Sequence, residues 1–244
     1  MPQSQGLLLR ETLKAIQLAS RGPATPVVVF DLDSTLFDVT PRLQRILHDF
    51  AQNPKFQTRF PDSCSILIEA EAHPKDWGFE NTLRRAGLDG HHPHFHQALK
   101  DFWIKTFFSN EYLEFDVPYQ GAVEFVQSVF AIGAQIVYLT GRDIPRQGLG
   151  TEKILKKWNF PLDPRTCRMV LKPQAHMPDA EFKEHFFQQF KPHTAIWLFE
   201  NEPVNINYIQ QRHPHVQMVF VDTVHSGLQQ VAVDVPLILH YILD

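Results

Sequence analysis

The sequence predicts an α/β fold, a Rossmann-like parallel sheet with helices on both faces, interrupted by a mainly helical insertion. From about residue 119 onward, short apolar strands alternate with helical patterns, and this alternation is typical of parallel sheets. Between residues 40 and 117, prolines at positions 54, 61, 74 and 93 separate short helical patterns without a convincing buried strand. We therefore expect a core domain of residues 1–39 and 118–244, and a helical domain of residues 40–117 that acts as a lid.

The first strand of the expected sheet ends in two carboxylates. Residues 27–30 form a continuous apolar run with β-branched residues, which is typical of a strand buried on both faces. Asp31 and Asp33 follow directly, and Ser34 and Thr35 come next. Ligands of open parallel sheets bind outside the carboxyl ends of the strands, so these acids are candidate site residues. The alternative is an ordinary turn, because Asp and Ser favour turns.

The other elements follow from hydrophobic periodicity and helix-end signals. Thr40 before Pro41 indicates an N-cap with proline at the first helical position, and Gly133 indicates a helix end. The expected helices cover residues 41–50, 119–130, 152–158, 179–190 and 204–212, and the expected strands cover residues 134–140, 167–171, 195–199 and 216–221. Residues 231–243 are apolar and fit either a strand or a helix.

The composition sets the broad class of protein. A chain of 244 residues with 43% hydrophobic residues has enough apolar material for one large domain with an insertion. Its formal net charge of −4 gives no overall basic field, which argues against nucleic-acid and membrane partners. Cys64 and Cys167 form no C-x-x-C pair, and residues 1–21 read as an amphipathic helix rather than a signal peptide. We therefore expect a cytoplasmic protein; the composition does not indicate its oligomeric state.

Polar groups also follow the later strands of the expected sheet. Thr140, Gly141 and Arg142 end the second strand, Lys172 ends the third, and the acidic stretch 200–202 ends the fourth. The carboxyl ends of parallel strands meet at one edge of a sheet. The sequence therefore predicts that these groups lie at the same edge as the two carboxylates of the first strand.

Taken in order, these motifs resemble those of the haloacid dehalogenase-like (HAD) hydrolase superfamily. The D-x-D-x-T run from Asp31 to Thr35, the strand closing in Thr140, a downstream lysine and the acid Glu200 carry the resemblance, which covers residues 27 to 221. The insertion stands in the place of that family's type 1 helical cap. The resemblance implies a hydrolase of the phosphatase branch, because dehalogenase members lack the second Asp. It also implies an aspartyl-phosphate intermediate and a magnesium ion.

The resemblance assigns a role to each acid. Asp31 would be the nucleophile, and Asp33 would protonate the leaving oxygen and then activate water. Mg²⁺ would take oxygen ligands from Asp31, the main-chain carbonyl of Asp33, and Glu200. Asn201 stands where the family commonly has a second acid, so the sequence departs from the usual metal motif. A polar helix start is the alternative interpretation of this acidic stretch.

The resemblance also gives roles to the groups that contact phosphate. Thr140 would donate a hydrogen bond to a phosphoryl oxygen while Gly141 allows close backbone approach. Arg142 would either bind a second anionic group or pair with Asp143 in solvent. Two lysines compete for the site next to the nucleophile. Lys172 directly follows a strand. Lys183 lies early in the next helix, in an arrangement similar to the phosphatase domain of phage polynucleotide kinase, and is favoured.

The expected substrate is a small phosphorylated metabolite or nucleotide, because a lid limits access to the crevice. Three alternatives remain: a phosphotransferase, a nucleic-acid 3′-phosphatase, and a catalytically weakened protein that binds a phosphorylated ligand or partner. The departure at Glu200 and Asn201 motivates the last of these. Two further segments are noted. The histidines of residues 91–96 suggest either zinc binding or a solvated loop, and residues 222–227 suggest either a supporting role at the same sheet edge or a turn.

Overall fold

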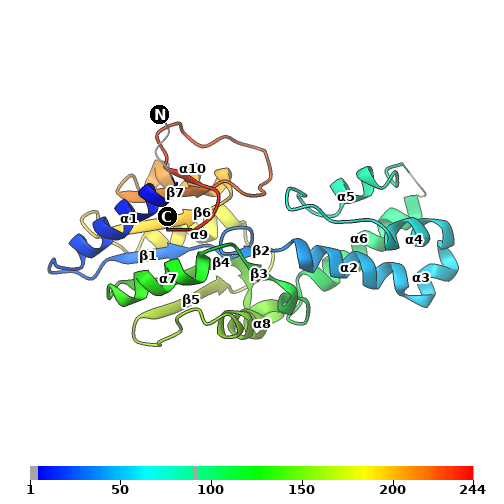
Figure 1. Ribbon diagram of the computed structural model, residues 1–244, viewed down its shortest axis with the longest axis horizontal. Helices are drawn as coiled ribbons and strands as arrows, with labels where there is room; N and C mark the ends of the chain where they lie inside the picture. Colours follow the sequence, from blue (N-terminus) through cyan, green and yellow to red (C-terminus); the bar gives the residue numbers. More distant parts are fainter. Residues whose placement is uncertain (1–4, 91–92, 244) are drawn as a thin grey trace. The chain divides into compact units, whose positions relative to one another are not determined.

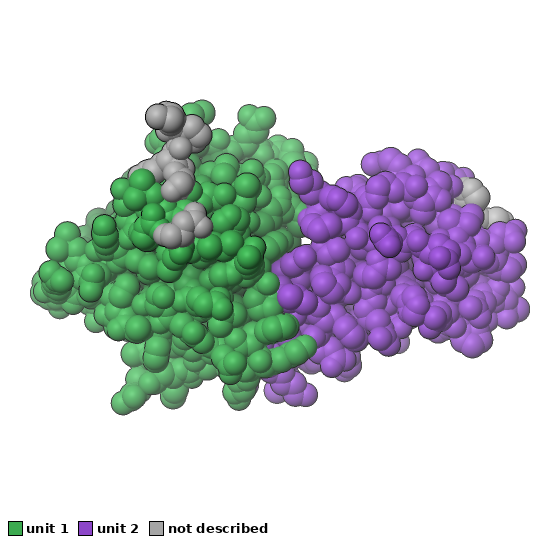
Figure 2. Space-filling view, in the orientation of Figure 1, with its two compact units in different colours: residues 1–37, 118–145, 155–244 green, residues 38–117, 146–154 purple. Residues whose placement is uncertain are grey.

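The computed structural model describes residues 5–90 and 93–243. The chain divides into two compact units (Figure 2). The core unit comprises residues 1–37, 118–145 and 155–244, and the helical unit comprises residues 38–117 and 146–154. Residues 146–154, which the sequence analysis assigns to the core domain, group with the helical unit.

A six-stranded sheet forms the centre of the core unit (Figure 1). Its strand order is β5-β4-β1-β6-β7-β8, and each neighbouring pair is parallel. The strands are β1 (Val27–Phe30), β4 (Gln135–Asp143), β5 (Cys167–Lys172), β6 (Ile196–Glu200), β7 (Val216–Val221) and β8 (Leu237–Ile238). The predicted parallel α/β fold is confirmed, and the C-terminal segment contributes one short strand to it.

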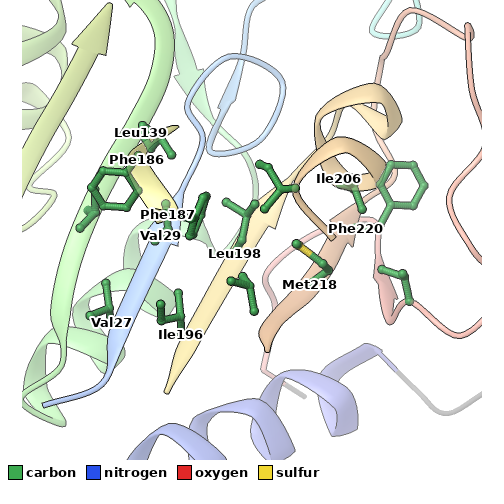
Figure 3. Close-up of a cluster of buried hydrophobic side chains, with 14 residues drawn as sticks. Val27, Val29, Leu139, Phe186, Phe187, Ile196, Leu198, Ile206, Met218 and Phe220 are labelled. Carbon is green, nitrogen blue, oxygen red and sulfur yellow. The ribbon is translucent and has the colours of Figure 1, made fainter. Parts of the chain in front are cut away.

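Helices cover both faces of this sheet. They are α1 (Gln5–Ala19), α7 (Ala122–Ala131), α9 (Asp179–Phe187) and α10 (Pro203–Arg212). Helix α8 (Ile144–Lys157) begins and ends in the core unit, but its residues 146–154 belong to the helical unit. One face packs against α9 and α10 through a cluster that includes Val29, Phe187 and Ile206 (Figure 3). On the opposite face, Phe30 lies 6.3 Å from Phe125 of α7, centroid to centroid, and α1 packs against α7. Alternate residues of β1 therefore face opposite layers, which is why this strand is apolar throughout.

Two predicted helix boundaries were wrong. The helix expected from residue 119 begins only at Ala122, because Gly121 adopts a left-handed φ of 79°. A Cβ at Gly121 would lie 2.6 Å from the backbone of Tyr241, so only glycine fits there. The helix expected from residue 152 begins at Ile144, because Pro145 falls in the first turn, where proline is tolerated.

The helical unit has a core of its own. Its helices are α2 (Thr40–Gln52), α3 (Pro54–Arg59), α4 (Pro61–Ile68), α5 (Glu80–Arg85), α6 (Pro93–Phe107) and the 3-10 helix η1 (Tyr112–Phe115). Phe50 lies at the centre of this core, with ring centroids 4.0 Å from Phe56 and 5.6 Å from Phe102. The prolines at positions 54, 61 and 93 each begin a helix, which explains why they punctuate the sequence.

Two details complete the description of this unit. Thr40 was expected as the N-cap of α2, but it is the first helical residue, and Asp38 Oδ1 accepts the Thr40 N–H at 2.8 Å. The short strands β2 (Phe37–Asp38) and β3 (Val117–Pro118) pair with each other where the chain leaves and re-enters the core unit.

Among the described residues, none of the helices has the length and apolar character required to cross a membrane.

Candidate active site

The candidate site lies at the carboxyl edge of the central strands. Phe30, the last residue of β1, pairs with Tyr138 of β4 and with Phe199 of β6. Asp31, which directly follows β1, donates its N–H to the Phe199 carbonyl at 3.0 Å. Because β6 ends at Glu200, the register brings Asp31 and Glu200 to the same level of the sheet edge.

Lys183 joins the two strand-end acids. Its Nζ donates to Asp31 Oδ1 at 2.7 Å and to Glu200 Oε2 at 2.6 Å. The side chain of Lys183 is 3% exposed, and those of Asp31 and Glu200 are 6% and 1% exposed. Helix α9 positions the lysine, because Phe186 and Phe187 on the same helix anchor it to the sheet face. The result is a buried ion-pair triad.

The second lysine lies elsewhere. Lys172 Nζ donates to Asp179 Oδ1 at 2.6 Å and to the carbonyls of Ala175 and Met177 at 3.3 and 3.2 Å. It therefore folds onto the loop that follows its own strand. Of the two lysines that the sequence offered, the structure brings Lys183 to the first carboxylate.

The charges of this cluster are unbalanced, and the pKa values reflect that imbalance. Burial raises the pKa of Asp31 to about 7; Lys183 opposes this rise, and the charges of Glu200 and Asp33 add to it. Burial disfavours the charged form of Lys183, but Asp31 and Glu200 outweigh it and raise the pKa of the lysine above its ordinary range. The lysine therefore stays cationic, and the cluster retains excess negative charge.

A second set of oxygens meets on the other side of Asp31. Thr35 Oγ1 lies 3.1 Å from Asp31 Oδ2 and 3.0 Å from Asn201 Oδ1. One hydroxyl proton serves two acceptors, so one of these oxygens keeps unused acceptor capacity. The amide orientation is fixed because Asn201 Nδ2 donates to the Val224 carbonyl at 2.6 Å. Three hard oxygens, Asp31 Oδ2, Thr35 Oγ1 and Asn201 Oδ1, therefore lie together.

Asp33 is the more exposed of the two acids in the opening motif. Its side chain is 32% exposed, whereas that of its partner Arg142 is 1% exposed. Arg142 donates to both carboxylate oxygens, with Nη2–Oδ1 at 2.7 Å and Nε–Oδ2 at 3.2 Å. Of the two alternatives considered for Arg142, the structure shows a buried guanidinium that pairs with Asp33, not a side chain in solvent. Strand β4 continues to Asp143 through an irregularity after Thr140, which keeps Arg142 in the sheet.

Thr140 and Gly141 directly precede Arg142 in β4. Thr140 is buried, and its Oγ1 accepts the Arg142 N–H at 3.3 Å. A hydroxyl that accepts in this way still has its own proton to donate to a ligand. At Gly141 a Cβ would overlap the Asp179 carboxylate, so a larger residue would displace that side chain. The glycine thus serves close packing of Asp179 in this structure.

The loop after β7 supports the site from behind. Thr223 Oγ1 donates to the Ser34 carbonyl, and the Val224 carbonyl accepts from Asn201. Ser226 donates its N–H and its hydroxyl to Glu202, at 2.9 and 2.8 Å. The segment 222–227, for which a supporting role or a plain turn was considered, therefore holds both strand-end loops in position.

Sequence reasoning did not identify Tyr241. Its side chain is buried, with ring centroids 5.5 Å from Phe125 and 6.0 Å from Phe199. Its hydroxyl has no hydrogen-bond partner among the described residues. Burial, reinforced by the charges of Asp31 and Glu200, raises the pKa of this phenol well above its ordinary range. The C-terminal segment has no clear periodicity, so no sequence signal could have placed this ring.

The donor set fits a hard divalent cation. Within residues 5–90 and 93–243, no group of three or more His, Cys, Asp or Glu side chains is arranged to hold a metal ion. Mg²⁺, however, binds through one or two carboxylates and completes its shell with other oxygens and water. The Asp31 carboxylate and the Asn201 amide oxygen provide such ligands, and a cation would also offset the excess negative charge. Both oxygens of Glu200 are engaged, by Lys183 and by the Glu202 N–H at 3.1 Å.

In the described part of the histidine segment, neither His94 nor His96 belongs to a group of three or more metal-binding side chains. His91 and His92 lie outside the described residues. His96 Nε2 lies 2.9 Å from the Leu88 carbonyl oxygen, and its Nδ1 lies 3.7 Å from Glu80. These contacts are local to the helical unit and bring no third ligand to His96.

Comparison with known proteins supports the fold. The sequence matches no protein-family model and no curated protein. Solved structures do match. One is a HAD-superfamily hydrolase of subfamily IA, variant 1, from Geobacter sulfurreducens PCA (11% identity, 90% of this chain, 94% of that chain, TM-score 0.51). Another is Protein Tyrosine Kinase A (PtkA) from Mycobacterium tuberculosis (14% identity, 88% of this chain, 94% of that chain, TM-score 0.52). A HAD-superfamily hydrolase from Ehrlichia chaffeensis also matches (10% identity, 90% of this chain, 94% of that chain, TM-score 0.49).

The chain therefore has a haloacid dehalogenase-like fold, as its motifs indicated. Identities this low establish the architecture alone.

Proposed function

We propose that this protein is a magnesium-dependent phosphatase that hydrolyses a small phosphomonoester through an aspartyl-phosphate on Asp31. The observation that carries the proposal is the buried triad of Asp31, Lys183 and Glu200, with the second acid Asp33 two residues from the first. Phosphoryl transfer requires a positioned nucleophile, positive charge near the phosphoryl oxygens and a proton for the leaving group. Each requirement has a residue in this arrangement.

Lys183 prepares the nucleophile. It holds Asp31 Oδ1 at 2.7 Å, which fixes the carboxylate and favours its ionised form. The other oxygen, Oδ2, lies on the side of Thr35 and Asn201. We assign the attack on phosphorus to Oδ2. Glu200 anchors the lysine from the opposite side, so its role in this proposal is to position Lys183.

Asp31, the main-chain carbonyl of Asp33 and Asn201 would hold Mg²⁺, with Glu200 adding negative charge behind them. When bound, the ion supplies positive charge that offsets the charge of the phosphoryl group. This assignment gives Asn201 the place that the sequence favoured for Glu200. A carboxylate already held by a lysine and an N–H has less freedom to serve as a ligand.

Asp33 acts as general acid in the first step and as general base in the second. In the first step, an oxygen of Asp31 bonds to phosphorus, the ester P–O bond breaks, and Asp33 gives its proton to the departing oxygen. In the second, Asp33 removes a proton from water, the water oxygen attacks phosphorus, and the bond to Asp31 breaks. Asp33 is ion-paired with Arg142 in this structure. That pair must loosen before Asp33 carries a proton, and a substrate phosphate is an alternative partner for the guanidinium.

The proposed substrate class is a small phosphorylated metabolite or nucleotide. Thr140 supplies a hydroxyl donor for a phosphoryl oxygen, and Arg142 supplies a bidentate cation of the kind that recognises phosphate. Lys172 is tied to Asp179 and two carbonyls, so it needs to exchange partners before it can contact substrate.

The direct test is turnover of p-nitrophenyl phosphate by the purified full-length protein with Mg²⁺ or with EDTA. We expect magnesium-dependent turnover that Asp31→Asn abolishes. Asp234→Asn, at an exposed carboxylate of the same unit, is the matched control and should retain activity. Acid-quenched reactions with radiolabelled phosphate ester should show a hydroxylamine-labile phosphoenzyme.

The outcomes separate the competing functions. Absence of turnover on p-nitrophenyl phosphate and on a broad panel of phosphorylated metabolites would overturn the phosphatase proposal and favour a protein that binds a phosphorylated ligand. Product that forms only with an added acceptor alcohol would instead indicate a phosphotransferase. Both alternatives keep the same anion-binding residues, which is why binding alone does not distinguish them.

A further inference from the structure

A basic groove on the helical unit has no role in the proposed chemistry. It has a volume of about 390 Å³ and is lined by two helices, α3 and α6. Its lining residues are Lys55, Phe56, Arg59, His94, Gln97, Ala98, Asp101, Phe102 and Lys105. The volume lies within the usual range for ligand sites, about 300–1,000 Å³. All of these residues belong to the helical unit.

The cations of the groove lack acidic partners. Lys55, Arg59 and Lys105 are exposed, and within the described residues no carboxylate pairs with any of them. Other exposed arginines do have such partners, as Arg45 has Asp49. Three lone cations gathered in one groove contrast with the formal net charge of −4 of the whole chain. The groove is therefore a local attraction site for an anion.

The floor of the groove is aromatic and rigid. Phe56 and Phe102 are half-buried, with ring centroids 5.8 Å apart in an edge-to-face arrangement. Phe50 holds both from beneath, stacked on Phe56 at 4.0 Å. Half-buried rings between exposed cations offer apolar surface next to positive charge. That combination suits a ligand with flat rings spaced along an anionic backbone.

We infer that this groove binds single-stranded nucleic acid, with Lys55, Arg59 and Lys105 on the phosphates and the Phe56 and Phe102 rings against bases. An acidic peptide fits the charges but lacks flat rings. The groove also contains Asp101, which accepts from Gln97 Nε2 at 2.8 Å. Its carboxylate is also an acceptor for a base N–H, such as N3–H of thymine. This inference does not rest on the proposed phosphatase function.

The test is fluorescence anisotropy of a fluorescein-labelled single-stranded oligothymidylate titrated with the full-length protein in EDTA. Three phosphate contacts predict a log–log dependence of affinity on salt with a slope of about −2, so a tenfold rise in salt should weaken binding about 100-fold. The variant with Lys55→Gln, Arg59→Gln and Lys105→Gln should lose at least tenfold in affinity at low salt and most of the salt dependence. EDTA keeps the readout independent of turnover.

A matched variant separates the groove from general charge. Lys75→Gln, Arg84→Gln and Lys100→Gln remove the same charge from the same unit at exposed positions that do not line the groove. This variant should bind almost as the unaltered protein does. Equal losses in the two variants would show that the effect is nonspecific, and would overturn the assignment of the groove.

The aromatic contribution needs its own variant. Phe56→Leu keeps an apolar side chain and should weaken oligonucleotide binding by about fivefold or more without changing the salt slope. A circular dichroism melt checks that the fold is retained, and an abasic oligonucleotide should bind both proteins alike. Polyglutamate of equal charge that competes as well as the oligonucleotide would identify an acidic-peptide site and refute the inference. Absence of saturable binding at low salt would refute it as well.

Discussion

Acidic pH should stabilise the metal-free protein through Asp31. Burial, followed by the charge of Glu200, raises the pKa of this carboxyl from 3.8 to about 7 despite the opposing effect of Lys183. A group whose pKa is higher in the folded state binds more protons there than in the unfolded state. Its stabilising contribution is therefore complete below about pH 4 and is lost as the pH rises through about 7.

The magnitude follows from the size of that shift. Each pKa unit corresponds to about 1.36 kcal/mol, so between pH 5 and pH 8 the contribution of Asp31 to the free energy of unfolding should fall by about 3 kcal/mol. Lys183 adds no slope in this range, because its pKa is raised above its ordinary range and it stays protonated in both states. The contribution of this triad to the free energy of unfolding of the metal-free protein is therefore largest at acidic pH.

Urea denaturation in EDTA at pH 5 and pH 8 measures this contribution, with Asp31→Asn as the reference. All other titratable groups are common to the two proteins, so the difference between the two pH dependences isolates Asp31. Added Mg²⁺ should stabilise the unaltered protein more at pH 8 than at pH 5, because cation and proton compete for the same carboxylate. Identical pH dependences in the two proteins, or a sign opposite to the expected one, would refute this reasoning.

Three further predictions test other parts of the structure. Lys183→Ala should lower turnover of p-nitrophenyl phosphate by about 100-fold or more, since it removes the cation next to the nucleophile, whereas Lys172→Ala should cost about tenfold or less; the opposite order would contradict the assignment. Asn201→Ala should raise the magnesium concentration needed for half-maximal turnover, and an unchanged titration would exclude Asn201 as a ligand. Arg42→Met should reduce the free energy of unfolding by about 3–5 kcal/mol, because it leaves the fully buried Asp116 without its bidentate partner. Adding Asp116→Leu should restore most of that loss in a chemical-denaturation experiment, and no recovery would show that packing rather than charge dominates.

Local sequence patterns were sufficient for the elements of the sheet. The apolar run of β1 and the later strand–helix alternation both reflect the hydrophobic effect, which buries apolar side chains. The spacing of apolar residues is visible in the sequence, residue by residue. Predictions failed where backbone conformation depended on a distant partner. Gly121 delays α7 because the backbone of Tyr241 lies against it. Position 150 of α8 requires glycine because a Cβ there would lie 2.6 Å from the backbone of Asn110.

The pairing of charged side chains was beyond local pattern. Lys183 reaches Asp31 across 152 positions of the chain, and Arg142 reaches Asp33 across 109 positions. No periodicity in the sequence predicts either pairing. Both depend on how α9 packs on the sheet and on how far β4 continues before it ends.

The class of fold, the edge of the sheet where polar groups gather and the identity of the acids at that edge follow from local pattern, because buried strands and their turn residues are local properties. Three features depend on how the chain packs: which lysine meets Asp31, the burial of Arg142 against Asp33, and the oxygen that Asn201, and not Glu200, leaves available beside the nucleophile. The physical reason is that each of these pairings requires the burial of charge, and burial is produced by packing between segments that are remote in the chain.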